Sequence, residues 1–454
     1  MNIITDEKRI DEILERGVIS KDGILPTSDK FRERLLSGDR LRFYIGADPT
    51  AVALHLGHAQ NLILLEDFRK LGHEVIFLIG DFTAMIGDPT DKGAARVKQT
   101  RAQIEENFGN WKEQVRNILS FDDEENPVQI KFNSEWLSKL DFAEVLELAS
   151  NFTVQQMLER DMFEKRFYGS ATCKICGEKF VLKSRDNAGC LNRPSQCPYC
   201  KCEPKSGEPY VYNNGLPIYI HEFMYPLMQG YDSVAMDVDV EICGTDQIFN
   251  ALAGRTLLRK LKNKEKFVVS ANLIADEKTG QLMSKSTGTG VFLNLSSKDL
   301  YGAVMSMTDG MIHSLFIGCT RVSLDEIKDL DIENNPRDAK MRLAFEIVKS
   351  FRSEDTANES QDYFVKTIQN KEIPDEFEVV EMGIKKEVKE IALIIFMVVS
   401  GLATSNGDAR RKIEQGGVSI DGEIIDDFSA VLTQKHDRKI IKVGKKNFRK
   451  IVFI

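Results

Sequence analysis

The stretch RFYIGADPTAVALHLGHAQNLILLEDFRKLGHEVIFLI, residues 42–79, decides the fold. Arg42 to Asp48 has the composition of a short strand, and apolar residues then recur at helical spacing until Gly72. Val75 to Ile79 is an unbroken apolar run of the kind that is buried in parallel sheets. The sequence therefore predicts strand, helix and parallel strand, which together form the βαβ unit of an α/β protein.

Regular elements continue on both sides of an interruption. Thr100 and Gln103 form a capping box before a helix whose apolar residues run through Ile118. Residues 128–132 alternate as a strand does, and helical patterns follow. Between about 169 and 214 the apolar periodicity gives way to cysteines, glycines and basic residues, which indicates an inserted module. Helices and a strand return up to about Phe292.

Size and composition predict a multidomain globular protein. With 454 residues and 42% hydrophobic content, the chain can bury a substantial core in two to four units. Its charged start lacks the apolar stretch of a secretion signal. The longest apolar run, Ile391 to Val399, is half of the roughly 20 residues that a membrane span needs. We therefore expect a soluble, cytoplasmic protein that does not bind membranes.

The charges are divided unevenly along the chain. The net charge is −9, which argues against a general nucleic-acid coat. Residues 405–454, however, contain 11 Lys/Arg and 7 Asp/Glu, so the rest of the chain is strongly acidic. An acidic body with a basic tail indicates an RNA contact near the end of the chain.

Six of the eight cysteines lie between Cys173 and Cys202. Two Cys-x-x-Cys pairs with twenty residues between them have the spacing of a zinc ribbon, and four thiolates complete a tetrahedral shell. We expect structural zinc in a module that has little apolar core of its own. Cys190 and Cys202 lie outside the two pairs, and Cys202 could replace Cys200 as a ligand. The alternative interpretation is that all six are free cysteines in a flexible loop. The expected ligands are Cys173, Cys176, Cys197 and Cys200.

The motif His55-Leu-Gly-His58 lies between the first strand and its helix. Both imidazoles then occupy the first turn, where free N–H groups and the helix dipole favour a phosphate. Gly57 has no side chain, so a flat adenine or a ribose can approach the backbone. In the alternative interpretation one histidine caps the helix and the other is an ordinary surface residue.

A second motif, Leu282-Met-Ser-Lys285-Ser286, lies far downstream between glycines and predicts a mobile loop. Lys285 there would neutralise charge that develops on a pyrophosphate leaving group, with Ser284 and Ser286 as further donors. A solvated loop lysine is the alternative.

Together the two motifs resemble the signatures of class I aminoacyl-tRNA synthetases. Segments 44–50, 80–89, 225–232 and 244–247 further resemble the tyrosine-specific, bacterial-type family in order and spacing. The resemblance covers most of residues 35–295. It implies a homodimeric ligase that activates tyrosine with ATP and Mg²⁺ to tyrosyl-adenylate and pyrophosphate, and then charges its tRNA.

The resemblance also implies roles for individual residues. Tyr44 and Asp232 would hold the phenolic hydroxyl of tyrosine, so that phenylalanine would leave a buried carboxylate unpaired. Asp88, Tyr225 and Gln229 would bind the substrate ammonium. Around ATP, Asp246 and Gln247 would lie over ribose and substrate, and Thr50, His55 and His58 would face phosphates and ribose. Lys92 and Arg96 would meet pyrophosphate on a basic loop. The alternative for Lys92 and Arg96 is that they are solvated surface charges.

Two residues depart from the family pattern. Leu282 stands where the family has the first lysine of Lys-Met-Ser-Lys-Ser, so one phosphate contact is in doubt and a slower enzyme is expected. Cys243 stands where a glycine precedes Gly244-Thr-Asp-Gln, a small change that we expect to be tolerated.

The tail has its own pattern. Ser405 and Asp408 cap a helix, and Asp421-Gly422 turns a hairpin. The tail resembles a small RNA-binding module shared with a ribosomal small-subunit protein. A solvated basic surface is the alternative. The helix residues expected to meet phosphates are Arg410, Arg411 and Lys412.

The predicted architecture is α/β. A Rossmann-like parallel-sheet catalytic domain (1–295) carries a zinc ribbon (about 169–214), and an α-helical anticodon-recognition region (296–375) and a small α+β RNA-binding domain (388–454) follow. Two rival functions remain: a tryptophan-specific relative, which Tyr44 and Asp232 disfavour, and a non-catalytic RNA-binding paralogue, for which Leu282 is the one hint.

Overall fold

A computed structural model of the chain describes residues 2–17, 23–87, 100–182, 196–201, 210–213, 216–271, 273–283, 290–370, 382–384, 390–444 and 447–453. The chain divides into two compact units, Met1–Ala357 and Asn358–Ile454. Within the described ranges no helix is both long and apolar enough to cross a bilayer. The limits given above for the catalytic, helical and RNA-binding domains stay predictions.

The first unit is built on a six-stranded sheet with strand order β1-β9-β8-β2-β3-β4. All neighbours are parallel except β1, which pairs antiparallel with β9 at one edge. The chain order reverses between β2 and β8, and ligands of open α/β sheets bind at such a point, beyond the carboxyl ends of the strands. The strands are β1 (Ile24–Leu25), β2 (Arg42–Ala47), β3 (Glu74–Ile79), β4 (Gln129–Phe132), β8 (Val240–Gly244) and β9 (Phe267–Ala271).

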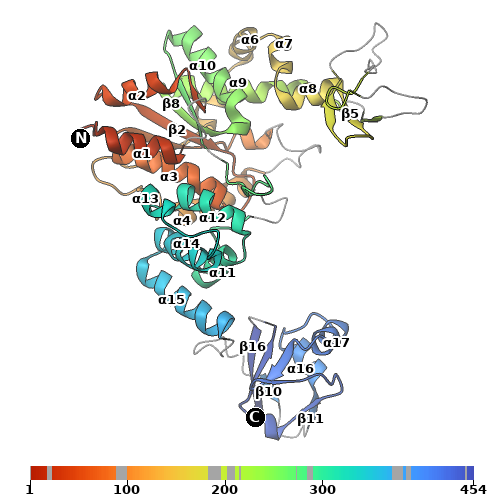
Figure 1. The fold of residues 1–454 in the computed structure, drawn as a ribbon. Coiled ribbons are helices and arrows are strands. Elements are labelled where there is room, and N and C mark those ends of the chain that lie inside the picture. Colours follow the sequence, from red (N-terminus) through yellow and green to blue (C-terminus); the bar gives the residue numbers. More distant parts are fainter. Residues whose placement is uncertain are drawn as a thin grey trace. The chain divides into compact units, whose positions relative to one another are not determined.

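Helices cover both faces of this sheet, with α1 and α3 on one side and α9 and α10 on the other (Figure 1). The predicted βαβ unit is confirmed, because β2 and β3 are joined by α3 and pair in parallel. The helices of the unit are α1 (Glu7–Gly17), α2 (Ser28–Leu36), α3 (Leu56–Lys70), α4 (Arg101–Val115), α5 (Ser134–Leu137), α6 (Phe142–Ser150), α7 (Val154–Leu158), α8 (Asp161–Tyr168), α9 (Ile220–Ala235), α10 (Ile248–Lys262), α11 (Ser297–Met305), α12 (Ile312–Cys319), α13 (Leu324–Lys328), α14 (Pro336–Phe351) and α15 (Glu354–Phe364), which runs into the second unit.

Aromatic packing fixes α3 against the sheet. The ring of Phe43 in β2 stacks on Phe68 in α3, with ring centroids 4.3 Å apart, and Phe31 meets both rings edge-on. All three side chains are fully buried. Removing such rings from water is a main source of stability, so this cluster holds the last turn of α3 against the first residues of β2.

Helix ends confirm the predicted signals. Thr100 caps α4, and both hydrogen bonds of its capping box with Gln103 are present. The helix ends at Val115, so Ile118, which fits the helical spacing, lies in a turn beyond it. Gly72 follows α3 with φ +99°, a conformation that favours glycine.

Close packing joins α9 to α10. A Cβ on Gly230 would lie 3.0 Å from Leu257 Cδ1 and 3.1 Å from the backbone nitrogen of Gly254, so the helices approach at two glycines. Below this contact, Val234 and Leu258 pack with Tyr44 of β2 in one buried cluster. The half of α9 after Tyr225 is thereby held against β2.

The cysteine-rich segment after α8 forms a small sheet of its own, with strand order β6-β5-β7. Among the described residues of this segment its core is slight, because Ala171, Leu182 and Tyr210 are the residues that join two cysteines in the buried cluster. The strands are β5 (Ser170–Cys173), β6 (Lys179–Val181) and β7 (Tyr210–Asn213).

The second unit is a small α+β structure with a five-stranded sheet in the order β10-β16-β15-β12-β13 and a second pair, β11-β14. The predicted hairpin at Asp421-Gly422 is confirmed, and both residues have the positive φ of a tight two-residue turn. The elements are β10 (Met382–Ile384), β11 (Glu390–Ala392), α16 (Leu393–Val399), α17 (Asn406–Glu414), β12 (Val418–Ile420), β13 (Glu423–Ile424), β14 (Val431–Thr433), β15 (Ile440–Val443) and β16 (Asn447–Phe453).

The contact between α9 and α10 gives a prediction for stability. Gly230→Ala is expected to lower the free energy of unfolding of the first unit by about 1–3 kcal/mol, because the new methyl group overlaps α10. Both tryptophans, Trp111 and Trp136, lie in this unit, so tryptophan fluorescence during denaturant unfolding reports on it alone.

Gly109→Ala is the matched control. A Cβ at Gly109 in α4 meets nothing within 4 Å, so this change should raise stability by about 0.5–1 kcal/mol. An unfolding midpoint of Gly230→Ala at or above that of the unchanged chain would contradict the close packing.

Candidate active site

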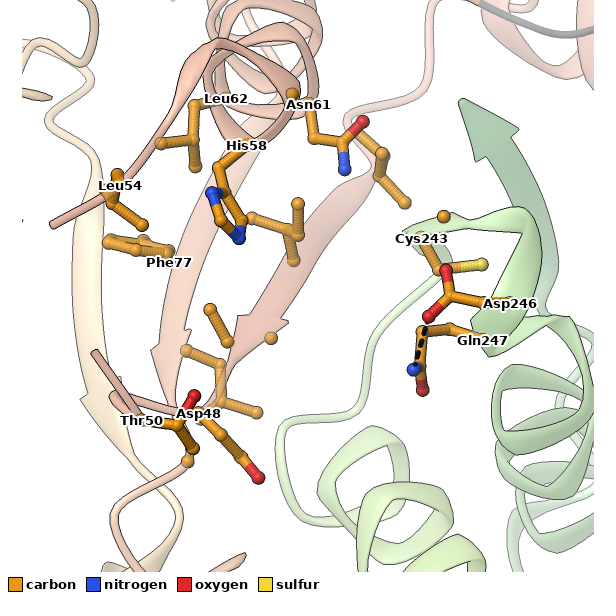
Figure 2. Close-up of a pocket in the computed structure, with 18 of the residues that line it drawn as sticks. Asp48, Thr50, Leu54, His58, Asn61, Leu62, Phe77, Cys243, Asp246 and Gln247 are labelled. Atoms are coloured by element: carbon orange, nitrogen blue, oxygen red, sulfur yellow. Dashed lines mark hydrogen bonds between the residues drawn. The ribbon is translucent and has the colours of Figure 1, made fainter. Parts of the chain in front are cut away.

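A cavity of about 1020 Å³ opens at the carboxyl ends of β2 and β8, where the chain order of the sheet reverses. Figure 2 shows Asp48 and Thr50 just after β2, His58 on α3, and Asp246 and Gln247 just after β8 along its wall. Loops and helix starts thus bring segments that are nearly 200 residues apart in the chain around one space.

The start of α3 presents two neutral histidines to the cavity. His55 is the N-cap, and its Nδ1 accepts a hydrogen bond from the backbone N–H of Gly57 at 3.1 Å. His58 Nδ1 accepts from the N–H of His55 at 3.2 Å. With both Nδ1 atoms accepting, each ring carries its proton on Nε2, which is then a donor.

Their surroundings keep these rings uncharged. Burial lowers the pKa of His55 to about 4. His58 is exposed to the cavity, and desolvation by the protein around it, together with the neighbouring His55, lowers its pKa to about 3. At neutral pH the pair therefore offers N–H donors and the helix dipole to an anion, without a full positive charge. Gly57 lies close under this ring, because a Cβ would lie 2.9 Å from His55 Cε1.

Asp48 is a cavity residue to which the sequence interpretation gave no role. Its carboxylate accepts hydrogen bonds from the hydroxyl groups of Thr83 at 2.7 Å and Tyr225 at 2.8 Å. Asp48 follows β2 directly. A polar residue at the carboxyl end of a central parallel strand is typical of a binding site, and this position was the sequence signal that could have identified Asp48. Thr50, two residues later, also lines the cavity.

Tyr44 and Asp232, expected to hold a phenolic hydroxyl, both lie at the cavity wall and are almost completely buried. The Tyr44 hydroxyl lies 3.0 Å from Ser233 Oγ. Asp232 accepts hydrogen bonds from Trp136 Nε1 at 2.8 Å and Asn133 Nδ2 at 3.3 Å. Burial raises the pKa of Asp232 well above its usual value, although both hydrogen bonds oppose this shift.

Tyr225 and Gln229, expected at the substrate ammonium, lie one turn apart on α9 and both line the cavity. Gln229 Nε2 donates to Glu241 Oε1 at 3.0 Å, and its Oε1 accepts from Asn250 Nδ2 at 2.9 Å. Their expected partner Asp88 lies outside the described residues.

Asp246 and Gln247 lie side by side at the opposite wall, and Gln247 Nε2 donates to Asp246 Oδ2 at 2.9 Å (Figure 2). Gly244 leaves room for this arrangement, because a Cβ there would lie 2.6 Å from Asp246 Oδ1. Cys243 also borders the cavity, and burial raises the pKa of its thiol, so it is a protonated, unreactive group.

The second motif is described in part. Leu282 and Met283 are described and border the cavity, so the second motif begins at the site. The remaining expected groups lie outside the described residues: Lys92, Arg96, Ser284, Lys285 and Ser286.

Four cysteines of the inserted module meet in one cluster. Their sulfur atoms all lie within 4.8 Å of one another. The distances are 3.8 Å for Cys173–Cys200 and 3.7 Å for Cys176–Cys197. Four ligands at about 2.3 Å from a tetrahedral zinc have sulfur atoms about 3.8 Å apart, so the donor set fits such an ion. Cys190 and Cys202 lie outside the described residues.

The basic side chains of α17 in the second unit already have partners within that unit. Ser405 caps α17 as predicted. Arg411 and Lys412 each pair with Asp408 at 2.9 Å, and Arg410 lies over the ring of Phe428. The charges of Arg411 and Lys412 are thus partly neutralised within the helix.

Comparison with known proteins assigns the fold. Residues 36–175 and 208–369 match the family model "tRNA synthetases class I (W and Y)", and the gap between these segments holds most of the cysteine-rich insertion. Residues 365–451 match a model for the SYY-like C-terminal domain of tyrosine–tRNA ligases.

Relatives and solved structures agree. The chain is 36% identical to a tyrosine–tRNA ligase of Carboxydothermus hydrogenoformans, covering 99% of both chains. It is 35% identical to that of Thermotoga maritima, covering 99% of this chain and 98% of the relative. A truncated mitochondrial tyrosyl-tRNA synthetase of Aspergillus nidulans shares the fold with a TM-score of 0.56 and 19% identity, over 78% of this chain and 92% of that one. The chain therefore belongs to the class I tRNA synthetases of the tryptophan and tyrosine family.

Proposed function

We propose that the chain is a tyrosine–tRNA ligase, which activates tyrosine with ATP and transfers it to the 3′ end of its tRNA. The observation that carries this specificity is Asp232, a buried carboxylate at the cavity wall within the same pocket as Tyr44. A ligand hydroxyl that donates to Asp232 supplies a further hydrogen bond to this costly buried charge. Phenylalanine has no hydroxyl to offer there.

Activation needs no protein nucleophile. A carboxylate oxygen of tyrosine attacks the α-phosphorus of ATP, the bond to the bridging oxygen breaks, and pyrophosphate leaves with its Mg²⁺. The neutral His55 and His58 and the start of α3 stand where donors to phosphate are needed. A ribose hydroxyl of the tRNA then attacks the tyrosyl carbonyl carbon, and AMP leaves.

The remaining predicted groups complete this proposal. Asp48 and Tyr225 form the polar wall at which the ammonium of tyrosine would bind, together with Gln229 and Asp88. Asp246 and Gln247 would take the ribose, with Thr50 nearby. Lys92, Arg96 and Lys285 would meet the pyrophosphate. Leu282 borders the cavity where a lysine is usual, so we expect slower activation.

We also propose that the second unit contacts tRNA, with α17 among its phosphate-binding elements. Arg410 would contribute most, since Arg411 and Lys412 share Asp408. The homodimer and the cytoplasmic location stay predictions.

The function is tested by exchange of labelled pyrophosphate into ATP. We expect exchange that depends on tyrosine and is absent with tryptophan. Phenylalanine should be slower by a factor on the order of 10⁴–10⁵, the range for sites that bind a substrate hydroxyl, of which tyrosine-specific synthetases are the standard example. Exchange with tryptophan would support the tryptophan-specific relative, and exchange with neither would support the non-catalytic paralogue.

We further propose that the cysteine cluster holds structural zinc. Elemental analysis should give about one zinc per chain, and Cys176→Ser with Cys200→Ser should abolish it, because two of four ligands are lost. Loss of the ion should speed proteolysis within residues 170–213. Cys319→Ser is the control, since this buried thiol lies elsewhere and donates to the carbonyl of Leu56. A metal-free preparation with an equally protease-resistant insertion would refute the proposal.

A further inference from the structure

A chain of buried polar side chains lies behind the tyrosine end of the cavity, and the reaction proposed above does not use it. Lys266, just before β9, forms an ion pair with Glu241 of β8 and donates to Ser233 Oγ of α9 at 2.9 Å. Ser233 in turn meets the Tyr44 hydroxyl. Lys266, Ser233 and Tyr44 are 0% exposed and Glu241 is 2% exposed.

The structure makes room for this ion pair. A Cβ on Gly254 would lie 2.5 Å from Lys266 Nζ and 2.6 Å from Ser233 Oγ. Buried ion pairs give little net stability over apolar side chains of similar size. Stability alone therefore does not explain why two charges lie at this place, and their contacts suggest what they do.

The first contact fixes a hydrogen bond at the phenol end of the pocket. An ammonium group only donates, so Ser233 must accept from Lys266. The other polar neighbour of Ser233 Oγ among the described residues is Tyr44, so the serine proton points to the Tyr44 oxygen. Tyr44 then has its own proton to offer to a ligand oxygen.

The second contact fixes the amide of Gln229. A carboxylate only accepts, so Gln229 must turn its Nε2 toward Glu241. Its Oε1 then faces the other way, toward Asn250, and keeps a lone pair for a donor in the cavity. With the opposite amide orientation, an N–H would face the substrate ammonium and repel it.

We propose that the Lys266–Glu241 ion pair is a positioning element for tyrosine, which fixes the hydrogen-bond direction of Tyr44 through Ser233 and the amide orientation of Gln229 directly. The proposal rests on the proposed function. It predicts that the phenolic oxygen of the substrate accepts from Tyr44 while its proton goes to Asp232. Glu241 borders the cavity, whereas Lys266 and Ser233 are not among the residues that line it.

Ser233→Ala separates this role from a structural one. It removes the link to the phenol end and leaves the contact between Glu241 and Gln229 intact. Titration calorimetry should give a Kd for tyrosine raised about fivefold to tenfold, the loss of roughly one hydrogen bond. The Kd for phenylalanine, which has no hydroxyl, should change less than twofold.

The double change Lys266→Met with Glu241→Gln neutralises the pair without leaving one charge buried. The Kd for both amino acids should rise about tenfold, because the carboxylate that requires Gln229 Nε2 to face it is gone and the contact with Asn250 remains as the orienting hydrogen bond. Arg69→Met with Glu66→Gln is the matched control, a buried ion pair in the same unit that does not border the cavity. It should leave both Kd values within twofold.

Three results would overturn the proposal. The first is that Ser233→Ala raises the Kd for tyrosine and for phenylalanine equally, and the second is that Ser233→Ala leaves the Kd for tyrosine unchanged. The third is that the control double change raises both Kd values as much as the change of the Lys266–Glu241 pair does. Tryptophan fluorescence checks that each variant is folded, and the Ser233→Ala result decides alone if the double variant unfolds. If the unchanged chain does not bind tyrosine more tightly than phenylalanine, the proposed function itself fails. If the unchanged chain does prefer tyrosine and one of the three results above is found, the positioning proposal alone fails.

Discussion

The close contact of α9 with α10 is the constraint on which the site depends. Two glycines, Gly230 and Gly254, let the helices approach until a single methyl group would overlap. At that distance, one face of α9 is pressed toward the sheet, and Tyr225, Gln229 and Asp232, spaced by four and three residues, all border the cavity. Polar groups buried in this way must have partners, and Asp48, Glu241 and Trp136 supply them from neighbouring elements.

The cavity is chemically divided as a result. Two carboxylates, Asp48 and Asp232, mark one part of its wall, where a cationic amine and a hydroxyl find acceptors. The start of α3 marks another part, with the neutral histidines and free backbone N–H groups that suit phosphate. A molecule that joins an amino acid to a nucleotide is therefore bound in one orientation, which is what adenylate formation requires.

Local signals in the sequence predicted much of this arrangement. The apolar run 75–79 gave the parallel strand, Thr100 with Gln103 gave the start of α4, and Asp421-Gly422 gave the hairpin, since each depends on near neighbours. The two Cys-x-x-Cys pairs were likewise brought together as their spacing predicted. Family resemblance supplied the residues of the tyrosine pocket, and the cavity contains all of those that the structure describes.

Long-range partners were beyond sequence reasoning. Lys266 has the sequence context of a solvated lysine before a strand, yet it is completely buried. Its burial is possible because Glu241 and Ser233, from two other elements, bind its ammonium group. Asp48 reads as part of a turn, and only the fold brings Thr83 and Tyr225 to its carboxylate. Such contacts depend on which elements become neighbours in the sheet, and the local pattern does not encode that order.

The most direct test is a crystal structure of the chain with tyrosine bound. The account predicts that the phenolic oxygen lies within about 2.6–3.2 Å of both the Tyr44 hydroxyl and the Asp232 carboxylate, with the ammonium group near Asp48. A tyrosine bound in this cavity with its phenolic oxygen away from both side chains would contradict the account.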